Sequence, residues 1–292
     1  MSRLLVILAT LTLIACNSEP VATTQTETAA PQKSQLATVL DAQPEKVKAR
    51  YQYRHPQETL EFFGIEPGMT VMEALPGGGW YSKVLLPYLG KDGHLIGADY
   101  DLDMYAAFGF YDDERLEKLK TWVTDWTADA ESWRDDDSAS VSAFVLGSMP
   151  GDLAGSADAV LFIRALHNLN NYESDGGYLT AALADAYTLL KPGGIVGVVQ
   201  HQSSDEMSDE WADGSNGYLK KSLVVERMES AGFEFVSASS MNENSNDRPG
   251  EEDFVWRLPP SFDGSEDDSG KRDAMQAIGE SNRMTLKFRK PE

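Results

Sequence analysis

The chain has 292 residues, of which 47 are acidic and 25 are basic, so that its formal net charge is −22. This charge argues against binding to nucleic acid and against electrostatic docking on anionic lipid, because both need an excess of Lys and Arg. A single cysteine excludes a disulfide within the chain.

Residues 1–16 have the pattern of a secretory leader. Arg3 precedes an apolar run that is too short to cross a hydrocarbon core of about 30 Å. The run ends in Leu-Ile-Ala-Cys, which resembles the lipobox of bacterial lipoproteins, and Cys16 is then the acylated N-terminus of the mature protein. Asn17 stands where an aspartate would indicate inner-membrane retention, so we expect a periplasm-facing protein that is lipid-anchored in the outer membrane.

Residues 17–42 are rich in Thr, Ala, Gln and Pro and contain few large apolar side chains. This composition predicts a disordered tether between the lipid and a folded domain. The domain itself, residues 43–292, has about 250 residues, which suffice for one sizeable core. A helical region over residues 44–63 leads into it.

Residues 71–101 carry the most informative pattern of the chain. A short apolar run meets Glu73 and breaks at Pro76-Gly77-Gly78-Gly79, a helical pattern follows, and a second apolar run ends on Asp99. This order predicts the first βαβ unit of a nucleotide-binding sheet. Glycines have no Cβ and adopt positive φ, so a ligand can lie against the backbone at the helix N-terminus. An acid at the position of Asp99 can accept both hydroxyls of a ribose.

The turn favours S-adenosylmethionine over a dinucleotide. Ser82 stands where the motif G-x-G-x-x-G of dehydrogenases has its third glycine, and Trp80 and Tyr81 occupy the space that a pyrophosphate needs. Glu73 would repel a diphosphate, but it suits a sulfonium or an ammonium group.

The remaining elements continue the alternation of strands and helices. We expect strands at 142–146, 157–163, 195–200 and 233–237, helices at 103–134, 175–190 and 218–231, and a last strand at 284–288 that alternates apolar and polar residues. Such alternation predicts a doubly wound α/β sheet, in which the last strand can be antiparallel. Residues 239–283, between the last two strands, are long enough for a lid-like insertion, where Arg248 or Arg283 could close on an anion.

Four segments together resemble the class I S-adenosylmethionine-dependent methyltransferases: GMTVMEALPGGGWYSKVL, SADAVLFIRALHNL, LLKPGGIVGVVQH and GESNRMTLKF. Within that superfamily the likeness is closest to a bacterial group of predicted methyltransferases that are often exported and have no assigned substrate. The resemblance implies a Rossmann-like methyltransferase fold, a mostly parallel seven-stranded sheet with an antiparallel last strand.

The resemblance also implies which residues hold the cofactor. In the family the glycine turn lies under the methionine part and the acid after the second strand holds the ribose. Ser148 stands where the family usually has an acid for the adenine amino group, so we expect adenine to rest on backbone or on Met149. The full set of expected cofactor contacts is Glu73, Pro76, Gly77, Gly78, Gly79, Tyr81, Asp99, Tyr100, Ser148 and Met149.

Methyl transfer needs alignment of a nucleophile with the methyl carbon, and a base only where the nucleophile loses a proton. The candidates lie where open α/β sheets bind ligands, after the fourth and fifth strands. We expect His167 to act as the base or to orient the substrate, with help from His201 and Asn168. Arg164 could bind a substrate carboxylate, and Tyr218 could line the pocket. The histidine spacing matches no metal motif, so no metal is expected.

Three functions compete at this point. The first is a methyltransferase that acts on a small molecule. The second is an exported, non-catalytic binding protein that kept the crevice, which is motivated by the conflict between the lipobox and a cofactor that is made in the cytoplasm. The third is a nicotinamide-dependent oxidoreductase, which Ser82 and the crowded turn disfavour.

Overall fold

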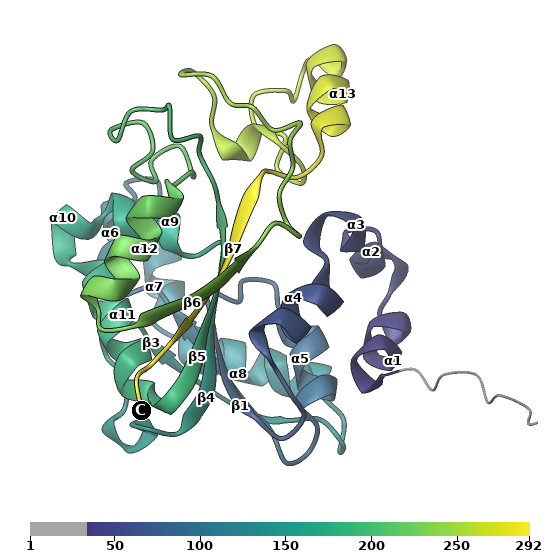
Figure 1. Ribbon diagram of the computed structural model, residues 1–292, viewed down its shortest axis with the longest axis vertical. Coiled ribbons are helices and arrows are strands. Elements are labelled where there is room, and N and C mark those ends of the chain that lie inside the picture. The colour runs from purple at the N-terminus through teal and green to yellow at the C-terminus, as the bar shows by residue number, and fades with distance from the viewer. Residues whose placement is uncertain (1–33) are drawn as a thin grey trace, which may run out of the picture. The chain divides into compact units, whose positions relative to one another are not determined.

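A seven-stranded sheet forms the centre of the part of the chain that the computed structural model describes, residues 34–292. β7 runs antiparallel to β5 and β6, and the other pairs of neighbouring strands are parallel. This arrangement confirms the predicted α/β class, a doubly wound and mostly parallel sheet with an antiparallel last strand (Figure 1). In spatial order the strands are β3 (Ser140–Val145), β2 (His94–Asp99), β1 (Thr70–Ala74), β4 (Ala157–Ile163), β5 (Leu190–His201), β7 (Arg283–Arg289) and β6 (Glu234–Ser239).

Helices cover both faces of the sheet (Figure 1). One core lies between the sheet and α6, α9, α11 and α12, and the other between the sheet and α1, α4, α5 and α8. The helices are α1 (Gln35–Ala42), α2 (Glu45–Lys48), α3 (Tyr51–Arg54), α4 (Pro56–Phe63), α5 (Ser82–Leu89), α6 (Leu102–Ala107), α7 (Asp113–Leu119), α8 (Trp122–Trp133), α9 (Leu166–Asn171), α10 (Glu173–Gly176), α11 (Tyr178–Leu189), α12 (Lys221–Ser230) and α13 (Ser269–Ile278). In residues 34–292 none of these helices is both long and apolar enough to cross a membrane.

Aromatic side chains pack directly on glycines of the strands. A Cβ at Gly97 would lie 2.6 Å from the ring of Trp126, and a Cβ at Gly197 would lie 2.6 Å from the ring of Phe63. The strands therefore need glycine here so that α8 and α4 can approach the sheet closely.

The tether prediction is wrong for its last residues. Residues 35–42 form α1, which Ser34 caps by accepting a hydrogen bond from the Ala37 amide at 3.1 Å. Leu36 and Leu40 lie four positions apart on one face of this helix and are buried against α5. This packing stabilises a helix that would be too short to form alone. The leader, Cys16 and the rest of the expected tether, residues 17–33, lie outside the described residues.

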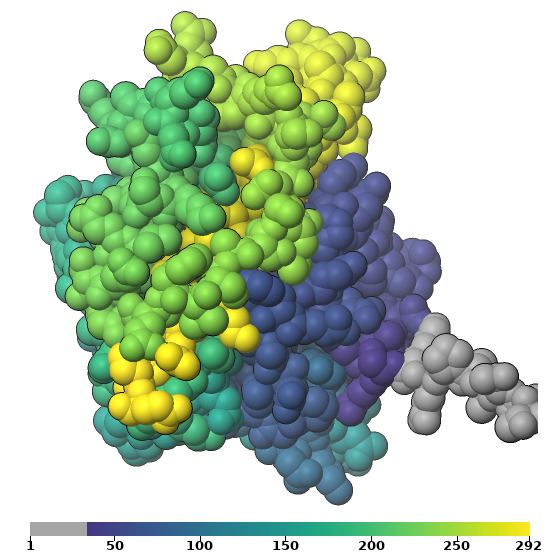
Figure 2. All heavy atoms as spheres, in the orientation of Figure 1, coloured from purple at the N-terminus to yellow at the C-terminus, as the bar shows by residue number. Residues whose placement is uncertain are grey.

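Residues 240–282, which we call the cover segment, lie at the end of the sheet where the parallel strands have their carboxyl termini (Figure 1). The loop after β5 lies at the same end (Figure 2). The buried carboxylate of Asp247 anchors the segment: it accepts hydrogen bonds from the Tyr218 hydroxyl at 2.9 Å, from Arg257 Nη2 at 2.9 Å and from the Asn282 amide at 2.8 Å. Tyr218 thus ties the segment to the loop after β5, while Arg257 and Asn282 fix it internally; its predicted role as a lid stays a prediction.

We expect Leu36→Ala to lower the free energy of unfolding by about 2–4 kcal/mol, because the change leaves a cavity under α1. Denaturant unfolding of the protein measures this loss. Thr38→Ala, on the exposed side of the same helix, is the matched control and should change stability by less than about 0.5 kcal/mol. Equal stability of Leu36→Ala and the wild type would mean that α1 is not part of the folded domain.

Candidate functional site

Charged and polar side chains from several strands meet at one edge of the sheet. Glu73 and Asp99 come from the ends of β1 and β2, and Arg164 directly follows β4. His201 ends β5 and pairs in register with Arg283, the first residue of the antiparallel β7. Because the carboxyl ends of parallel strands share one edge, residues that are far apart in sequence are brought together there.

The glycine turn after β1 leaves an open cradle. Gly77 has φ +52°, and a Cβ built on Gly77 or Gly78 would meet no atom within 4 Å. Gly79, by contrast, has φ +73°, and its Cβ would lie 2.4 Å from the ring of Trp133. Gly77 and Gly78 can therefore receive a ligand, whereas Gly79 is explained by its packing on α8.

The carboxylate of Glu73 is buried behind this turn. The Ser82 hydroxyl, at the start of α5, donates a hydrogen bond to Glu73 Oε2 at 2.6 Å. Burial raises the pKa of Glu73 to about 7, although Ser82 and the neighbouring Arg164 favour the ionised form. Ser82 stands where a dehydrogenase motif has its third glycine, and its hydroxyl fixes the Glu73 carboxylate in place.

Asp99 is also buried, and its pKa is raised to about 6, because burial outweighs the hydrogen bonds that it accepts. The hydroxyl of Tyr105, on α6, donates to Asp99 Oδ2 at 2.8 Å. Tyr100 follows Asp99, and its hydroxyl accepts a hydrogen bond from Asn168 Nδ2 at 3.0 Å. The sequence did not indicate Tyr105, because its contact with Asp99 depends on where α6 begins.

The turn after β3 has no acid of its own, but a carboxylate from α11 lies beside it. Ser148 is exposed and Met149 is half-buried. Asp185 of α11 accepts a hydrogen bond from the Gly147 amide at 2.6 Å, and burial raises the pKa of this carboxyl group. A carboxylate therefore lies at the turn even though position 148 is a serine.

The rings of His167 and His201 pack edge to face, with their centroids 5.4 Å apart. Gln200 Nε2 donates to the Gly217 carbonyl at 3.1 Å, so its Oε1 can accept from His167 Nδ1, 3.4 Å away. In this tautomer Nε2 of His167 is the proton acceptor. The Trp256 ring of the cover segment lies 5.8 Å from that of His167.

Both imidazoles are neutral at physiological pH. Burial is the main reason why the pKa of His167 falls to about 4, and Arg164 lowers it further. The pKa of His201 is well below its ordinary value because of burial, followed by His167 and several arginines. His201 Nδ1 also lies 2.5 Å from Ser281 Oγ. Neutral rings can accept a proton or a hydrogen bond, but a lowered pKa makes both imidazoles weak bases.

Three further predicted residues have side chains that are bonded within the protein. The Tyr218 hydroxyl donates to Asp247 and accepts from Arg257 Nη1 at 3.0 Å, so it supports the cover segment, although its ring is 6.1 Å from that of His201. Tyr81 is buried, and its hydroxyl donates to the Arg54 carbonyl at 3.4 Å. Arg248 is exposed and donates to the Ser245 carbonyl.

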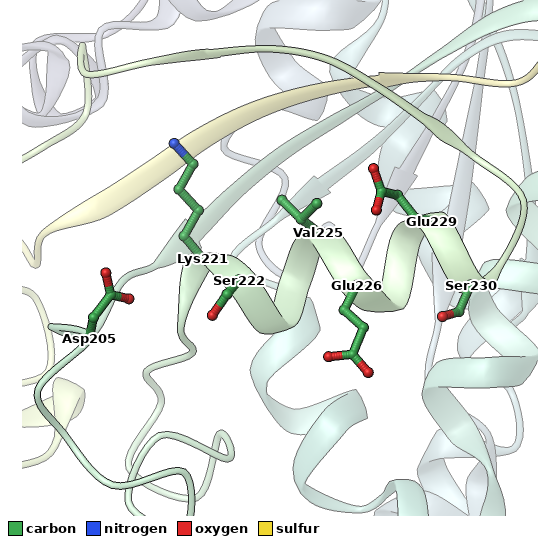
Figure 3. A pocket seen from close by; sticks show the side chains of 7 residues that line it. All are labelled: Asp205, Lys221, Ser222, Val225, Glu226, Glu229 and Ser230. Carbon is green, nitrogen blue, oxygen red and sulfur yellow. The ribbon is translucent and has the colours of Figure 1, made fainter.

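A hollow of about 700 Å³ lies along α12. The side chains that line it, among them Asp205, Lys221, Glu226 and Glu229, point in different directions (Figure 3). It includes no residue of the glycine turn or of the ends of β1 and β2, so it is not the ligand crevice that the sequence predicts. Within residues 34–292 no group of three or more His, Cys, Asp or Glu is placed to hold a metal ion.

No family model and no curated protein sequence matches the chain. Among solved structures it is similar to a geranyl diphosphate methyltransferase in complex with SAM, at 12% identity over 87% of this chain and 94% of that one, with a TM-score of 0.49. It is also similar to the Burkholderia thailandensis 1,6-didemethyltoxoflavin-N1-methyltransferase with bound S-adenosylhomocysteine (14% identity, 90% and 93% covered, TM-score 0.43). A third is the [4+2]-cyclase SpnF (17% identity, 82% and 80% covered, TM-score 0.47). At these identities the likeness concerns the fold alone, which the strand order already establishes.

The pKa of Glu73 makes stability depend on pH. Its carboxyl group binds a proton more tightly in the folded protein (pKa about 7) than in the unfolded chain (4.5), so its contribution to stability is present at low pH and lost as pH rises toward 7. We therefore expect Glu73→Gln to match the wild type near pH 4.5 and to exceed it by about 1–3 kcal/mol at pH 8. Denaturant unfolding at the two pH values measures the difference. Glu66→Gln, at an exposed site, should show no such dependence, and a constant offset for Glu73→Gln would contradict the assignment.

Proposed function

We propose that the protein is an S-adenosylmethionine-dependent methyltransferase that acts on a small molecule. The observation that carries the proposal is the open cradle of Gly77 and Gly78 between two buried acids, Glu73 at the end of β1 and Asp99 at the end of β2. We also propose that the protein belongs to the bacterial group of exported predicted methyltransferases that its sequence resembles.

The residues present fit this cofactor. Glu73 suits a cationic sulfonium or ammonium group, since two opposite charges 4 Å apart attract by about 4 kcal/mol at an effective dielectric constant of 20. Asp99 can accept hydrogen bonds from the two ribose hydroxyls once the Tyr105 hydroxyl yields its place. A dinucleotide fits less well, because its pyrophosphate would meet Glu73 behind the turn.

The bound cofactor would supply an electrophilic methyl carbon, and the protein has to align a nucleophile with it. Alignment alone can lower the barrier by about 7–11 kcal/mol. His167 and His201 remain neutral, so they can accept a hydrogen bond from an N–H or O–H of the acceptor and orient its lone pair. Trp256 of the cover segment lies 5.8 Å from the ring of His167, and both imidazoles are buried, which limits the access of water to them.

Calorimetric titration with S-adenosylhomocysteine tests the proposal. We expect saturable binding that Gly78→Trp abolishes by filling the cradle and that Asp99→Ala weakens on the order of 100-fold through the loss of two charged hydrogen bonds. Gly270→Trp, at another exposed glycine without positive φ, is the matched control and should bind normally. A folded wild-type protein that does not bind would remove the proposal. Binding without turnover across a broad metabolite panel would instead favour the non-catalytic binding protein.

We also propose that Cys16 carries the lipid that anchors the domain to the membrane facing the periplasm. The support is the lipobox pattern and the fact that Cys16 is the only cysteine. Cys16→Ala should move the protein from the membrane fraction to the soluble fraction and prevent labelling with a fatty-acid analogue. Ser18→Ala, two positions on, is the control, and membrane association of Cys16→Ala at the wild-type level would refute the anchor.

A further inference from the structure

A cluster of arginines lies beside the histidines at the carboxyl edge of the sheet. It consists of Arg50, Arg54, Arg164 and Arg283, and Glu280 is the carboxylate that pairs with three of them. In a chain with a net charge of −22, four guanidinium groups around one carboxylate are a local reversal of sign. We call this group the arginine cluster.

Glu280 is shared among its partners. Its Oε1 lies 2.6 Å from Arg50 Nη2, and its Oε2 lies 3.3 Å from Arg54 Nε and 3.3 Å from Arg283 Nη1. Arg54, Arg283 and Glu280 are each less than 5% exposed. One carboxylate therefore has to balance several charges in a region of low dielectric constant, where an unbalanced charge costs several kcal/mol.

Arg164 is the member of the cluster with the least compensation. It follows β4 in a left-handed conformation with φ 60°, and its amide donates to the Val199 carbonyl. Its Nε is buried without a hydrogen-bond partner in the described part of the chain. Burial and repulsion from Arg283 lower the pKa of Arg164 to about 10, and Arg164 in turn lowers the pKa of Arg54.

The other titratable groups that face Arg164 do not restore the balance. His167 and His201 are neutral, Tyr81 has a raised pKa, and Glu73 has a pKa of about 7, so that it is only partly ionised at neutral pH. A buried donor without an acceptor, next to an excess of positive charge, is a site that an anion would complete.

The place of this site in the sheet points to the methyl acceptor rather than to the cofactor. The cradle and Asp99 belong to β1 and β2, whereas Arg164, His201 and Arg283 belong to β4, β5 and β7 on the other side of β1. With strands about 4.8 Å apart, Arg164 lies one strand from β1, close enough to favour the ionised form of Glu73, whereas Arg283 lies three strands, or roughly 14 Å, from β1. Both histidines that can orient the nucleophile lie on the same side as Arg164.

We propose that the arginine cluster binds an oxyanion of the methyl acceptor, either a carboxylate or a phosphate, with Arg164 as the principal contact and Arg54 and Arg283 behind it. The proposal rests on the proposed function, since it names the class of substrate that the methyltransferase site takes. The acceptor group itself then lies between the anion and the methyl carbon, next to His167.

Succinate and inorganic phosphate serve as probes for the two kinds of oxyanion. Either one, added to the full domain, should raise the melting temperature and shift the ring resonances of His167 and His201, while His94, which is bonded to Ser140 on the far strands, stays unchanged. The probe that binds more tightly identifies the source of the oxyanion. Arg164→Gln should weaken this binding tenfold or more, and Arg164→Lys should weaken it less. Arg289→Gln, at the other end of β7, is the control and should bind as the wild type does.

Two comparisons separate this proposal from the function on which it rests. Arg164→Gln should fold with at least wild-type stability without the probe, because it removes an uncompensated charge, and it should still bind S-adenosylhomocysteine. Asp99→Ala should weaken that binding on the order of 100-fold but keep the response to the probe. No response in the wild type, or an equal response in Arg164→Gln, would overturn the proposal. So would loss of S-adenosylhomocysteine binding in Arg164→Gln, which would assign the cluster to the carboxylate of the cofactor. Absence of cofactor binding in the wild type would instead remove the proposed function.

Discussion

Charged groups are buried at the carboxyl edge of the parallel sheet, and their burial determines the chemistry of the candidate site. The parallel register of β1, β2 and β4 brings Glu73, Asp99 and Arg164 to the same edge. For each of them, burial is the largest cause of the shift in pKa. The edge therefore contains groups that water no longer solvates and that the protein only partly pairs, and a ligand with complementary charge would stabilise it.

Local patterns in the sequence were enough to predict the strands of the sheet and the glycine turn that forms the cradle. Each strand is marked by its own apolar run, and the glycine turn and Asp99 lie within one βαβ unit, so no distant contact was needed to find them. The spatial order of the strands was not predicted, because pairing between distant strands leaves no local signal. Gly79 was assigned to the ligand for the same reason: its packing partner, Trp133, is 54 positions away in sequence and is visible only in three dimensions.

The arginine cluster could not be predicted from the sequence. Arg54 and Glu280 are 226 positions apart in sequence. They meet because the start of β7, at Arg283, lies next to the end of α3, at Arg54. The segment that contains Glu280 and Arg283 was part of the family resemblance, but nothing in its composition indicated a buried ion pair. In the same way, Leu36 and Leu40 were too few apolar residues to distinguish a short packed helix from a tether, since their partners lie on α5.

The two halves of the edge have opposite charge, and this polarity bears on how two substrates would meet. Glu73 and Asp99 favour a cation over β1 and β2, whereas the arginine cluster favours an anion over β4, β5 and β7. A cationic methyl donor and an anionic acceptor held about 10 Å apart attract each other by about 2 kcal/mol at an effective dielectric constant of 20. Because this attraction exists only when both ligands are bound, binding of one would favour binding of the other. Under the proposed function, transfer of the methyl group would neutralise the sulfonium, which would remove this attraction and favour release of both products.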